Sequence, residues 1–334
     1  MSTPIRIAVD AMGGDFGPQI TVPAVIDSLL KKSQLRILLF GNKKNIERLL
    51  PKVPMKGLAG RLEVINCSSV AESIDSPIDV IRNKQSSSLC QSIMTVSKGD
   101  ADACVSAGST GALLMQSVRL IDTLPGIKRP AICASAPTYY GNVSLLDLGA
   151  NISCDANNFH QFGVLASMKC NLIDGIENPS IKLLNVGEEA NKGTKELKAA
   201  AKLFNEDKNL NYQGFIEGNN LFNDPVDVII CDGFTGNIAL KTAEGVARLA
   251  TGIGADIVKQ SFSLRLLSKI FTKSLDDFKN RLSPTKHNGA IFLGLNRIVV
   301  KSHGSAQKYA FENAIYKANL YAEKNIINLL QPKL

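Results

Sequence analysis

Two adjacent glycines between two aspartates follow the first short apolar run of this chain. The run Ile5–Val9 is typical of a β-strand, Asp10 comes directly after it, and Gly13, Gly14 and Asp15 complete the turn. Glycine lets the backbone adopt positive φ or approach a ligand closely. Because ligands of open α/β sheets bind where strands end and helices begin, this turn is a candidate floor for an anion or acyl-phosphate site. The structural alternative is a tight turn with an aspartate that caps the next helix.

Five further segments combine glycine with polar side chains after a predicted strand. In residues 106–112, Ser109 and Thr110 add hydroxyls to the backbone N–H groups of a predicted helix start, which suits an anion. The other segments are 146–151 with Asp147 and Asn151, 183–194 with Glu188, Glu189 and Lys192, 231–241 with Asp232 and Asn237, and 299–305 with Lys301, Ser302 and His303. Each segment can simply cap a helix. Six such strand ends together predict one common crevice.

Apolar runs and helical patterns alternate along the chain. Strands are predicted at 5–9, 35–40, 62–65, 103–106, 131–134, 144–148, 182–186, 214–217, 226–231 and 298–301, and helices at about 18–32, 43–50, 86–98, 109–122, 158–170, 189–206, 235–282 and 305–330. This alternation favours a doubly wound α/β sheet. The loops between these elements are mostly short, so we expect a single compact α/β domain over residues 1–334.

Composition narrows the class of protein. The 334 residues are 45% hydrophobic, and they contain neither a run of 18 apolar residues nor a secretory signal, which favours a cytoplasmic enzyme without a transmembrane helix. The seven cysteines have no metal-site spacing and no C-x-x-C pair, so we expect buried free thiols and no metal. The pattern calls for no cofactor.

The net charge of +8 is concentrated in one region. Residues 257–301 hold nine Lys or Arg against two acids, which indicates an acidic partner or an anionic surface, with a solvated helix face as the alternative. Nucleic acid is a poor candidate, because the chain has no Trp and the basic segment has no interleaved aromatic residues.

The helical pattern 235–282 is long for one globular helix. We interpret it as two helices that meet near residues 260–267, so that 245–282 forms a protruding amphipathic hairpin. Its basic second arm and apolar tip suit the membrane interface, with Leu264, Leu266, Leu267, Ile270 and Phe271 as the expected membrane contacts. The alternative is a helical pair that packs on a partner subunit. The two interpretations are compatible if the base of the hairpin packs on a partner subunit and its tip inserts into the membrane.

The strand-end segments also carry a family resemblance. The strings AVDAMGGD, SAGSTGALL, LDLGAN, LLNVGEE, CDGFTGN and KSHGSA closely resemble the bacterial phosphate acyltransferases in content and order, from residue 8 to residue 306. The resemblance implies a homodimer with a fold like the isocitrate and isopropylmalate dehydrogenases, acting peripherally at the membrane. The chain departs from the family at Ser109, usually Asn, at Asn219-Asn220, usually Arg-Asp, and at 286–289, usually a Tyr-Gly-Gly region. Roles at those positions are therefore in doubt.

The reaction implied by the resemblance transfers an acyl group from an acyl-acyl-carrier protein thioester to inorganic phosphate. Phosphate is already a nucleophile and a thiolate leaves readily, so the enzyme must only position phosphate and stabilise an oxyanion. The resemblance places a functional lysine at Lys192, which would orient phosphate, and Asn237 suits the oxyanion. Further phosphate-binding or substrate-binding candidates are Asp10, Gly13, Gly14, Asp15, Ser109, Thr110, Asp232 and His303. The aspartates and His303 can instead be structural.

Three other functions compete with this one. A phosphate acyltransferase that uses acyl-coenzyme A differs only in the thioester, and a membrane-recruited scaffold that binds the carrier protein would lack turnover. A nicotinamide dehydrogenase is disfavoured, because the nearest match to a dinucleotide fingerprint, Gly252-Ile-Gly254, lacks the third glycine and falls inside a helical pattern.

Overall fold

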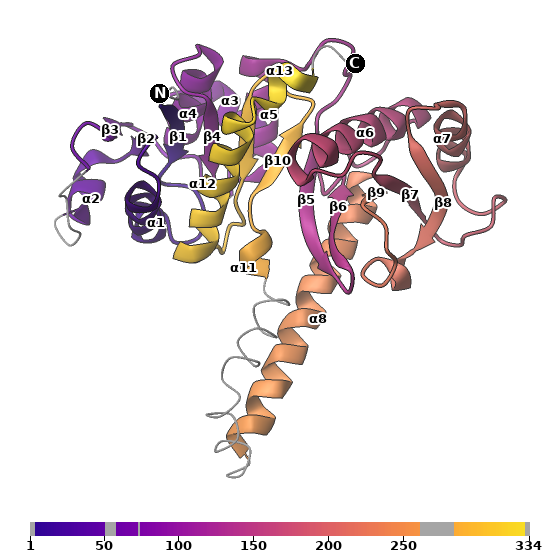
Figure 1. Ribbon diagram of the computed structural model, residues 1–334. Coiled ribbons are helices and arrows are strands. Elements are labelled where there is room, and N and C mark those ends of the chain that lie inside the picture. The colour runs from indigo at the N-terminus through magenta and orange to yellow at the C-terminus, as the bar shows by residue number, and fades with distance from the viewer. Residues whose placement is uncertain (1–3, 51–57, 73, 261–283, 331–334) are drawn as a thin grey trace.

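Within the described residues, eleven strands form one mixed sheet that runs across the molecule (Figure 1). This computed structural model describes residues 4–50, 58–72, 74–260 and 284–330. The strand order is β3 (Leu62–Asn66), β2 (Leu35–Gly41), β1 (Ile5–Asp10), β4 (Ala103–Ser106), β11 (Ile298–Lys301), β10 (Ala290–Leu293), β5 (Ala131–Thr138), β6 (Gly141–Leu146), β9 (Val228–Ile230), β7 (Ser180–Asn185) and β8 (Asn211–Glu217).

Strand direction reverses in the middle of this sheet. Strands β3, β2, β1, β4 and β11 are parallel and form the first half, while β6, β9, β7 and β8 are parallel and form the second half. Between them, β10 pairs antiparallel with β11 and with β5, and β5 pairs antiparallel with β6. The two parallel halves therefore point in opposite senses, and the six strand ends fall into two groups rather than along one edge.

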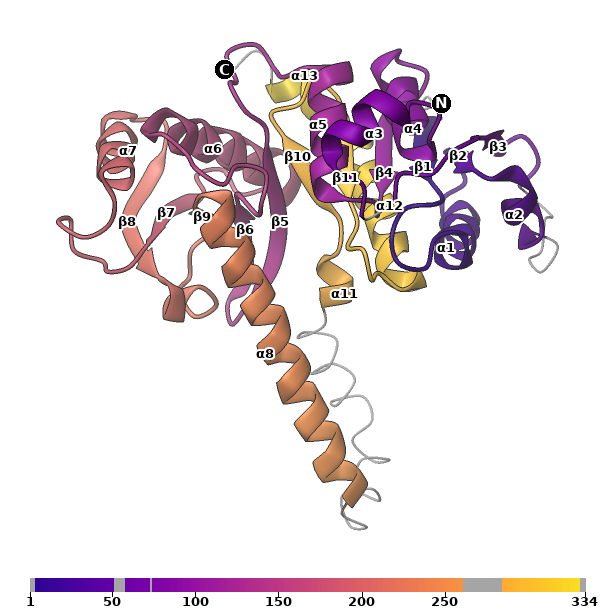
Figure 2. The same ribbon diagram turned by 180° about the vertical axis from the view of Figure 1, so that it is seen from behind.

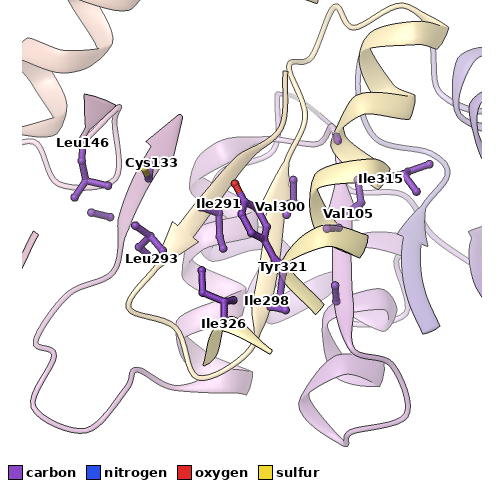
Figure 3. Packing of buried hydrophobic residues seen from close by; sticks show 14 of the residues in the cluster. Val105, Cys133, Leu146, Ile291, Leu293, Ile298, Val300, Ile315, Tyr321 and Ile326 are labelled. Atoms are coloured by element: carbon purple, nitrogen blue, oxygen red, sulfur yellow. The ribbon is translucent and has the colours of Figure 1, made fainter. Parts of the chain in front are cut away.

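Helices cover both faces of the sheet. One face carries α1 (Pro18–Lys31), α6 (Ala156–Lys169), α7 (Lys195–Glu206), α12 (Lys308–Glu323) and α13 (Ile326–Leu330), and the other carries α3 (Pro77–Asn83), α4 (Ser88–Ser97) and α5 (Thr110–Ile121). In β1, Ile7 and Val9 join one buried cluster and Ala8 joins the other, as the two-residue period of a strand requires. Figure 3 shows Val105, Ile291, Val300 and Tyr321 in the first of these clusters, where α12 packs on β1, β4 and β11.

Most predicted elements are found, and the differences are local. All ten predicted strands are present, but β10 and α3 were not predicted. Helix α3 has recognisable start signals, since Ser76 accepts a hydrogen bond from the Asp79 amide and Pro77 is its first residue. The remaining short elements are α2 (Lys43–Glu47), the π-helical turn Cys170–Asp174, the 3-10 turn Gly218–Asn220 and α11 (Pro284–His287).

Helix α8 (Gly233–Gln260) starts beside β9 and extends away from the body of the molecule (Figures 1 and 2). The first arm of the predicted hairpin is therefore helical as far as it is described. The turn and the second arm, with Leu264, Leu266, Leu267, Ile270 and Phe271, lie outside the described residues. In the part of the chain that the structure describes, no helix is both long and apolar enough to cross a membrane.

The helices α6 and α7 pack closely on the second half of the sheet, and a substitution at their contact tests this packing. A Cβ at Gly163 of α6 would overlap the buried ring of Phe204 of α7, whereas a Cβ at Gly252 of α8 meets nothing within 4 Å. We expect Gly163→Ala to lower the free energy of unfolding by about 1–3 kcal/mol through overpacking. Gly252→Ala should keep or raise it by up to about 1 kcal/mol, because Ala favours the helix. Urea unfolding of both variants measures this, and equal effects would contradict the packing.

Candidate active site

Three turns of the first half of the sheet meet at the ends of β1, β4 and β11. A Cβ at Gly13 would lie 2.6 Å from the Gly108 nitrogen, and one at Gly14 would lie 2.8 Å from the Gly304 carbonyl oxygen. Gly14 also has a φ of 86°, which favours glycine. The Asp15 amide donates a hydrogen bond to the Gly304 oxygen at 2.9 Å. The glycines are therefore required by close backbone contacts between turns that are distant in sequence.

Asp10 lies beneath these turns and ties two of them together. Its carboxylate accepts hydrogen bonds from the Ser106 hydroxyl at 2.7 Å and from the Met12 amide at 3.1 Å. The Ser106 oxygen in turn accepts the Gly108 amide at 3.0 Å. Burial raises the pKa of Asp10, while its hydrogen bonds from Ser106 and Met12 lower it. With 1% of its surface exposed, Asp10 is placed to hold the turns rather than to meet a ligand.

The neighbouring helix start and Lys301 surround the same turns. Ser109 stands at the N-cap of α5 without a side-chain capping bond, and Thr110 is the first residue of that helix, so both hydroxyls remain available beside it. The Lys301 ammonium lies 3.4 Å from the Ala107 carbonyl oxygen and also donates to the Ser302 carbonyl. Burial, and then the charge of Lys241, lower the pKa of Lys301 to about 8.

In the second half, a buried carboxylate organises the loop 147–151. Asp147 is fully buried and accepts the amides of Ile132 at 2.9 Å, Ala150 at 3.1 Å and Asn151 at 2.7 Å. Burial is the largest influence on Asp147 and raises its pKa, against the hydrogen bonds that lower it. The start of α8 packs on this loop, because the Gly233 amide donates to the Asn151 oxygen at 2.7 Å.

Two site candidates lie at this helix start. Asp232 caps α8: its carboxylate accepts the Thr235 amide and the Thr235 hydroxyl, each at 2.8 Å. The sequence left helix capping as the alternative role for Asp232, and its contacts are those of a helix cap. Asn237 is exposed, and its side chain lies next to Gly149 of the loop 147–151.

Helix α8 also reaches the first half of the sheet. The Lys241 ammonium lies 2.7 Å from Nε2 of His303 and 2.9 Å from the Glu244 carboxylate, which is 3.7 Å from the same His303 nitrogen. Asn237, Lys241 and Glu244 share one face of the helix, at positions i, i+4 and i+7. This contact brings the helix that carries Asn237 to the turn that carries His303, across the two groups of strand ends.

Lys192 is not part of this contact. It is exposed in the loop after β7, where its backbone amide donates to the Glu189 oxygen at 3.0 Å. Among the described residues, nothing forms a hydrogen bond or an ion pair with its ammonium. On the neighbouring turn, Asn220 donates to the Glu188 carboxylate at 3.4 Å. The structure therefore leaves Lys192 accessible in the second half without joining it to Asn237 or His303.

Sequence reasoning named Lys241 only as the last residue of the segment 231–241 and did not name Glu244. The signal was present, because both follow Asn237 at helical spacing within one predicted helix. Their partner His303, however, comes from a strand end 62 residues further on, and a helical period gives no information about that contact.

The cysteines show no activated thiol. All seven are free; six are buried and Cys154 is half-buried. Burial is the leading cause that raises the pKa of Cys67 to about 11 and those of Cys104 and Cys154 to about 12. Within the described ranges, no three His, Cys, Asp or Glu side chains gather as a metal site would require.

The fold of the chain is similar to that of the phosphotransacetylases. The structure of a phosphotransacetylase from Streptococcus pyogenes matches 96% of this chain and 94% of its own with a TM-score of 0.61 at 18% identity. A 4-hydroxythreonine-4-phosphate dehydrogenase from Klebsiella pneumoniae matches 96% and 100% with a TM-score of 0.55 at 14% identity, which shows the expected likeness to a dehydrogenase fold.

Sequence similarity shows the family to which the chain belongs. The model of a family described as fatty acid synthesis protein matches residues 5–329. The phosphate acyltransferase of Shewanella sediminis is 43% identical over 333 residues, which cover 99% of this chain and 97% of that protein. The chain belongs to this family of phosphate acyltransferases and is an acyltransferase.

The reactivity of the seven cysteines tests whether the protein has an activated thiol. At pH 8 a thiol with a pKa of about 11 is about 0.1% ionised, against about a quarter for an ordinary thiol. We therefore expect the folded protein to react with iodoacetamide more than about 100-fold more slowly than the urea-unfolded chain, in which all seven cysteines react. Mass spectrometry counts the labels. A single rapidly labelled cysteine in the folded protein would reveal an activated thiol.

Proposed function

We propose that this chain transfers an acyl group from an acyl-acyl-carrier protein thioester to inorganic phosphate, giving acyl phosphate for phospholipid synthesis. The observation that carries the proposal is the contact of Lys241 with His303, which brings the start of α8 to the glycine turns of the first half. A phosphate held at the turns would then lie near a helix that presents the amide of Asn237. The family relationship supports the phosphate acceptor.

The reaction needs no covalent enzyme intermediate. A phosphate oxygen attacks the thioester carbonyl carbon, the carbon–sulfur bond breaks, and the proton of hydrogen phosphate passes to the departing thiolate. A thiol of pKa about 8.5 is a good leaving group, so most of the acceleration comes from positioning and from stabilising the oxyanion. The raised pKa values of the buried cysteines agree with a direct attack by phosphate.

We assign the functional residues as follows. Lys192 orients phosphate, Asn237 donates its amide to the oxyanion, and Gly13 and Gly14 form the floor of the phosphate site with Ser109 and Thr110 beside it. Asp10 braces that floor, as its hydrogen bonds with Ser106 and Met12 support. Because no described residue forms a hydrogen bond or an ion pair with the Lys192 ammonium, its role requires the substrate to bring it to Asn237.

Exposed apolar side chains after the strand ends of the second half favour a long acyl group over acetyl. Ile152 is 76% exposed, Val186 80%, Phe234 59% and Ile238 50%, and all four follow the ends of β6, β7 and β9. Burying such side chains against an alkyl chain contributes about 25 cal/mol per Å². The basic segment 257–301 supports an acidic carrier protein as the donor.

The assignment of Lys192 is tested by acyl-phosphate formation, trapped with hydroxylamine. Lys192→Ala should lower turnover at least about 100-fold, as the loss of one transition-state donor typically does. Lys202→Ala, which removes another exposed lysine, from α7, is the matched control and should retain full turnover. Retained turnover in Lys192→Ala with acyl-carrier protein would contradict the role. Parallel rates with acyl-coenzyme A identify the preferred thioester, and binding without turnover would indicate a scaffold.

We also propose a homodimer that binds anionic membranes peripherally from the cytoplasm. On the exposed face of α8, Val246, Leu249, Ile253 and Ile257 are each more than half exposed and follow one another at three- and four-residue intervals. Such a stripe on a protruding helix is suited to a second copy, while the basic and apolar segment beyond it suits a lipid surface.

The membrane contact is tested by flotation with anionic liposomes. Leu267→Glu should reduce binding markedly, because a carboxylate would enter the apolar layer and repel anionic lipid, while turnover in solution persists. Leu329→Glu places the same charge on α13, where Leu329 is 44% exposed, and should bind as the wild type does. Undiminished binding of Leu267→Glu would contradict the membrane assignment.

A further inference from the structure

A cavity of about 700 Å³ lies on the outer face of α6, away from the candidate active site. Its floor is formed by Val164, Met168 and Leu172, half-buried apolar side chains that recur every four residues along α6 and the π-helical turn that continues it. None of the described residues that line it belongs to the six strand-end segments. Because pockets for small molecules typically have about 300–1,000 Å³, the cavity has the size of a ligand site that the proposed acyl transfer does not use.

Side chains of α6 hold two walls of this cavity in place. Gln161 donates a hydrogen bond to the Gly126 carbonyl oxygen at 2.7 Å, which fixes the loop before β5. Nε2 of His160 lies 2.9 Å from the Asp207 carboxylate, which fixes the loop after α7. The walls come from segments that are distant in sequence and are joined to the same helix by hydrogen bonds. The cavity is therefore a built feature of the second half of the molecule.

The polar atoms left over in the cavity are mostly acceptors. The amide nitrogen of Asn171 donates to the carbonyl oxygens of Ile176 and Glu177, each at 3.3 Å, which leaves its Oδ1. The amide nitrogen of Asn209 donates to the Asp207 carboxylate at 3.2 Å and likewise leaves its Oδ1. Among the described residues, no donor forms a hydrogen bond with either Oδ1 or with the Glu177 carboxylate. A ligand that fits these atoms must supply donors.

The charged side chains that line the cavity are carboxylates, apart from His160. Neither Lys nor Arg is among the described residues of the lining, and Asp207 is already engaged by His160, so Glu177 is the carboxylate left for a ligand. Two lysines lie nearby in sequence. Lys208 donates to a carbonyl oxygen of α7 at 3.4 Å, and Lys128 is exposed outside the lining. The lining therefore favours a positive charge beside Glu177.

We propose that this cavity binds a small amphiphilic amine, a molecule with a protonated amino group and an apolar body. The ammonium binds at the Glu177 end, where Asn171 supplies a neighbouring acceptor, and the body covers the apolar floor of Val164 and Met168. An ammonium has three N–H donors and no acceptor, which matches the acceptors that lack donors. The inference does not depend on the proposed acyl transfer.

Calorimetry with two ligands of similar shape and opposite charge tests the site. Phenylbutylamine supplies the ammonium, and phenylbutyrate is its anionic counterpart. We expect the amine to bind with a Kd of about 4 mM or below, as ligand efficiency gives for a molecule of this size, and about 5-fold more tightly than the acid. The net charge of +8 favours the acid in non-specific binding, so a preference for the amine identifies a local site.

Glu177→Lys reverses the charge at the acceptor end of the cavity. It should weaken binding of phenylbutylamine about 5-fold or more and strengthen that of phenylbutyrate, so that the preference inverts; a merely unfolded variant would bind neither. Glu63→Lys makes the same change of net charge at an exposed position of β3 and should bind both ligands as the wild type does. Equal affinity of the wild type for the two ligands, or unchanged affinities in Glu177→Lys, would overturn the site.

Histidine resonances show where the amine binds without reference to activity. The chain has three histidines, and His160 is the one in the cavity lining, so its imidazole signals are identified by comparison with His160→Gln. Phenylbutylamine should shift the His160 signals and leave those of His287 and His303 unchanged. A shift of His303 instead, or binding that moves none of the three, would locate the amine elsewhere and contradict the proposal.

Discussion

The reversal of strand direction at β10, β5 and β6 determines where every candidate residue lies. Because the two parallel halves of the sheet point in opposite senses, their strand ends cannot form a site along one edge. An element must cross from one group of strand ends to the other. Helix α8 does so, since its start packs on the loop 147–151 and its third turn contacts His303. The site depends on the position of this helix.

Each group of strand ends is built on a buried carboxylate. Asp10 accepts the Met12 amide and the Ser106 hydroxyl, and Asp147 accepts the backbone amides of Ile132, Ala150 and Asn151. A buried carboxylate is stable only when such donors replace water. In both halves the buried acid of the motif therefore shapes the backbone.

Much of the fold follows from local patterns, and the assembly of the site does not. The alternation of apolar runs and helices predicts ten of the strands, and the two-residue period of β1 predicts burial on both faces. The four-residue strand β10 was not predicted, although it is an apolar run, Ala-Ile-Phe-Leu, between Gly289 and Gly294, and its antiparallel pairing is what divides the strand ends. Six strand ends were predicted to converge on one crevice. The turns after β1, β4 and β11 do meet, but those after β6, β7 and β9 form a separate group. The contact of Lys241 with His303 depends on the direction of α8 relative to the sheet, which no local pattern encodes.

The residues that mark the family differ from those proposed to act on the substrate. The glycine motifs identify the family because close backbone contacts tolerate no side chain there, as at Gly13 and Gly14. Groups that meet a substrate must instead remain accessible, and Asn237, Lys241 and His303 are exposed on two elements that approach each other. Lys192 is exposed as well, but it belongs to a third loop without a fixed partner. In the proposed reaction, a substrate that spans the two halves of the sheet would therefore complete the site. It would contact α8, whose position is held by its contacts with both halves, and would bring the loop of Lys192 towards it.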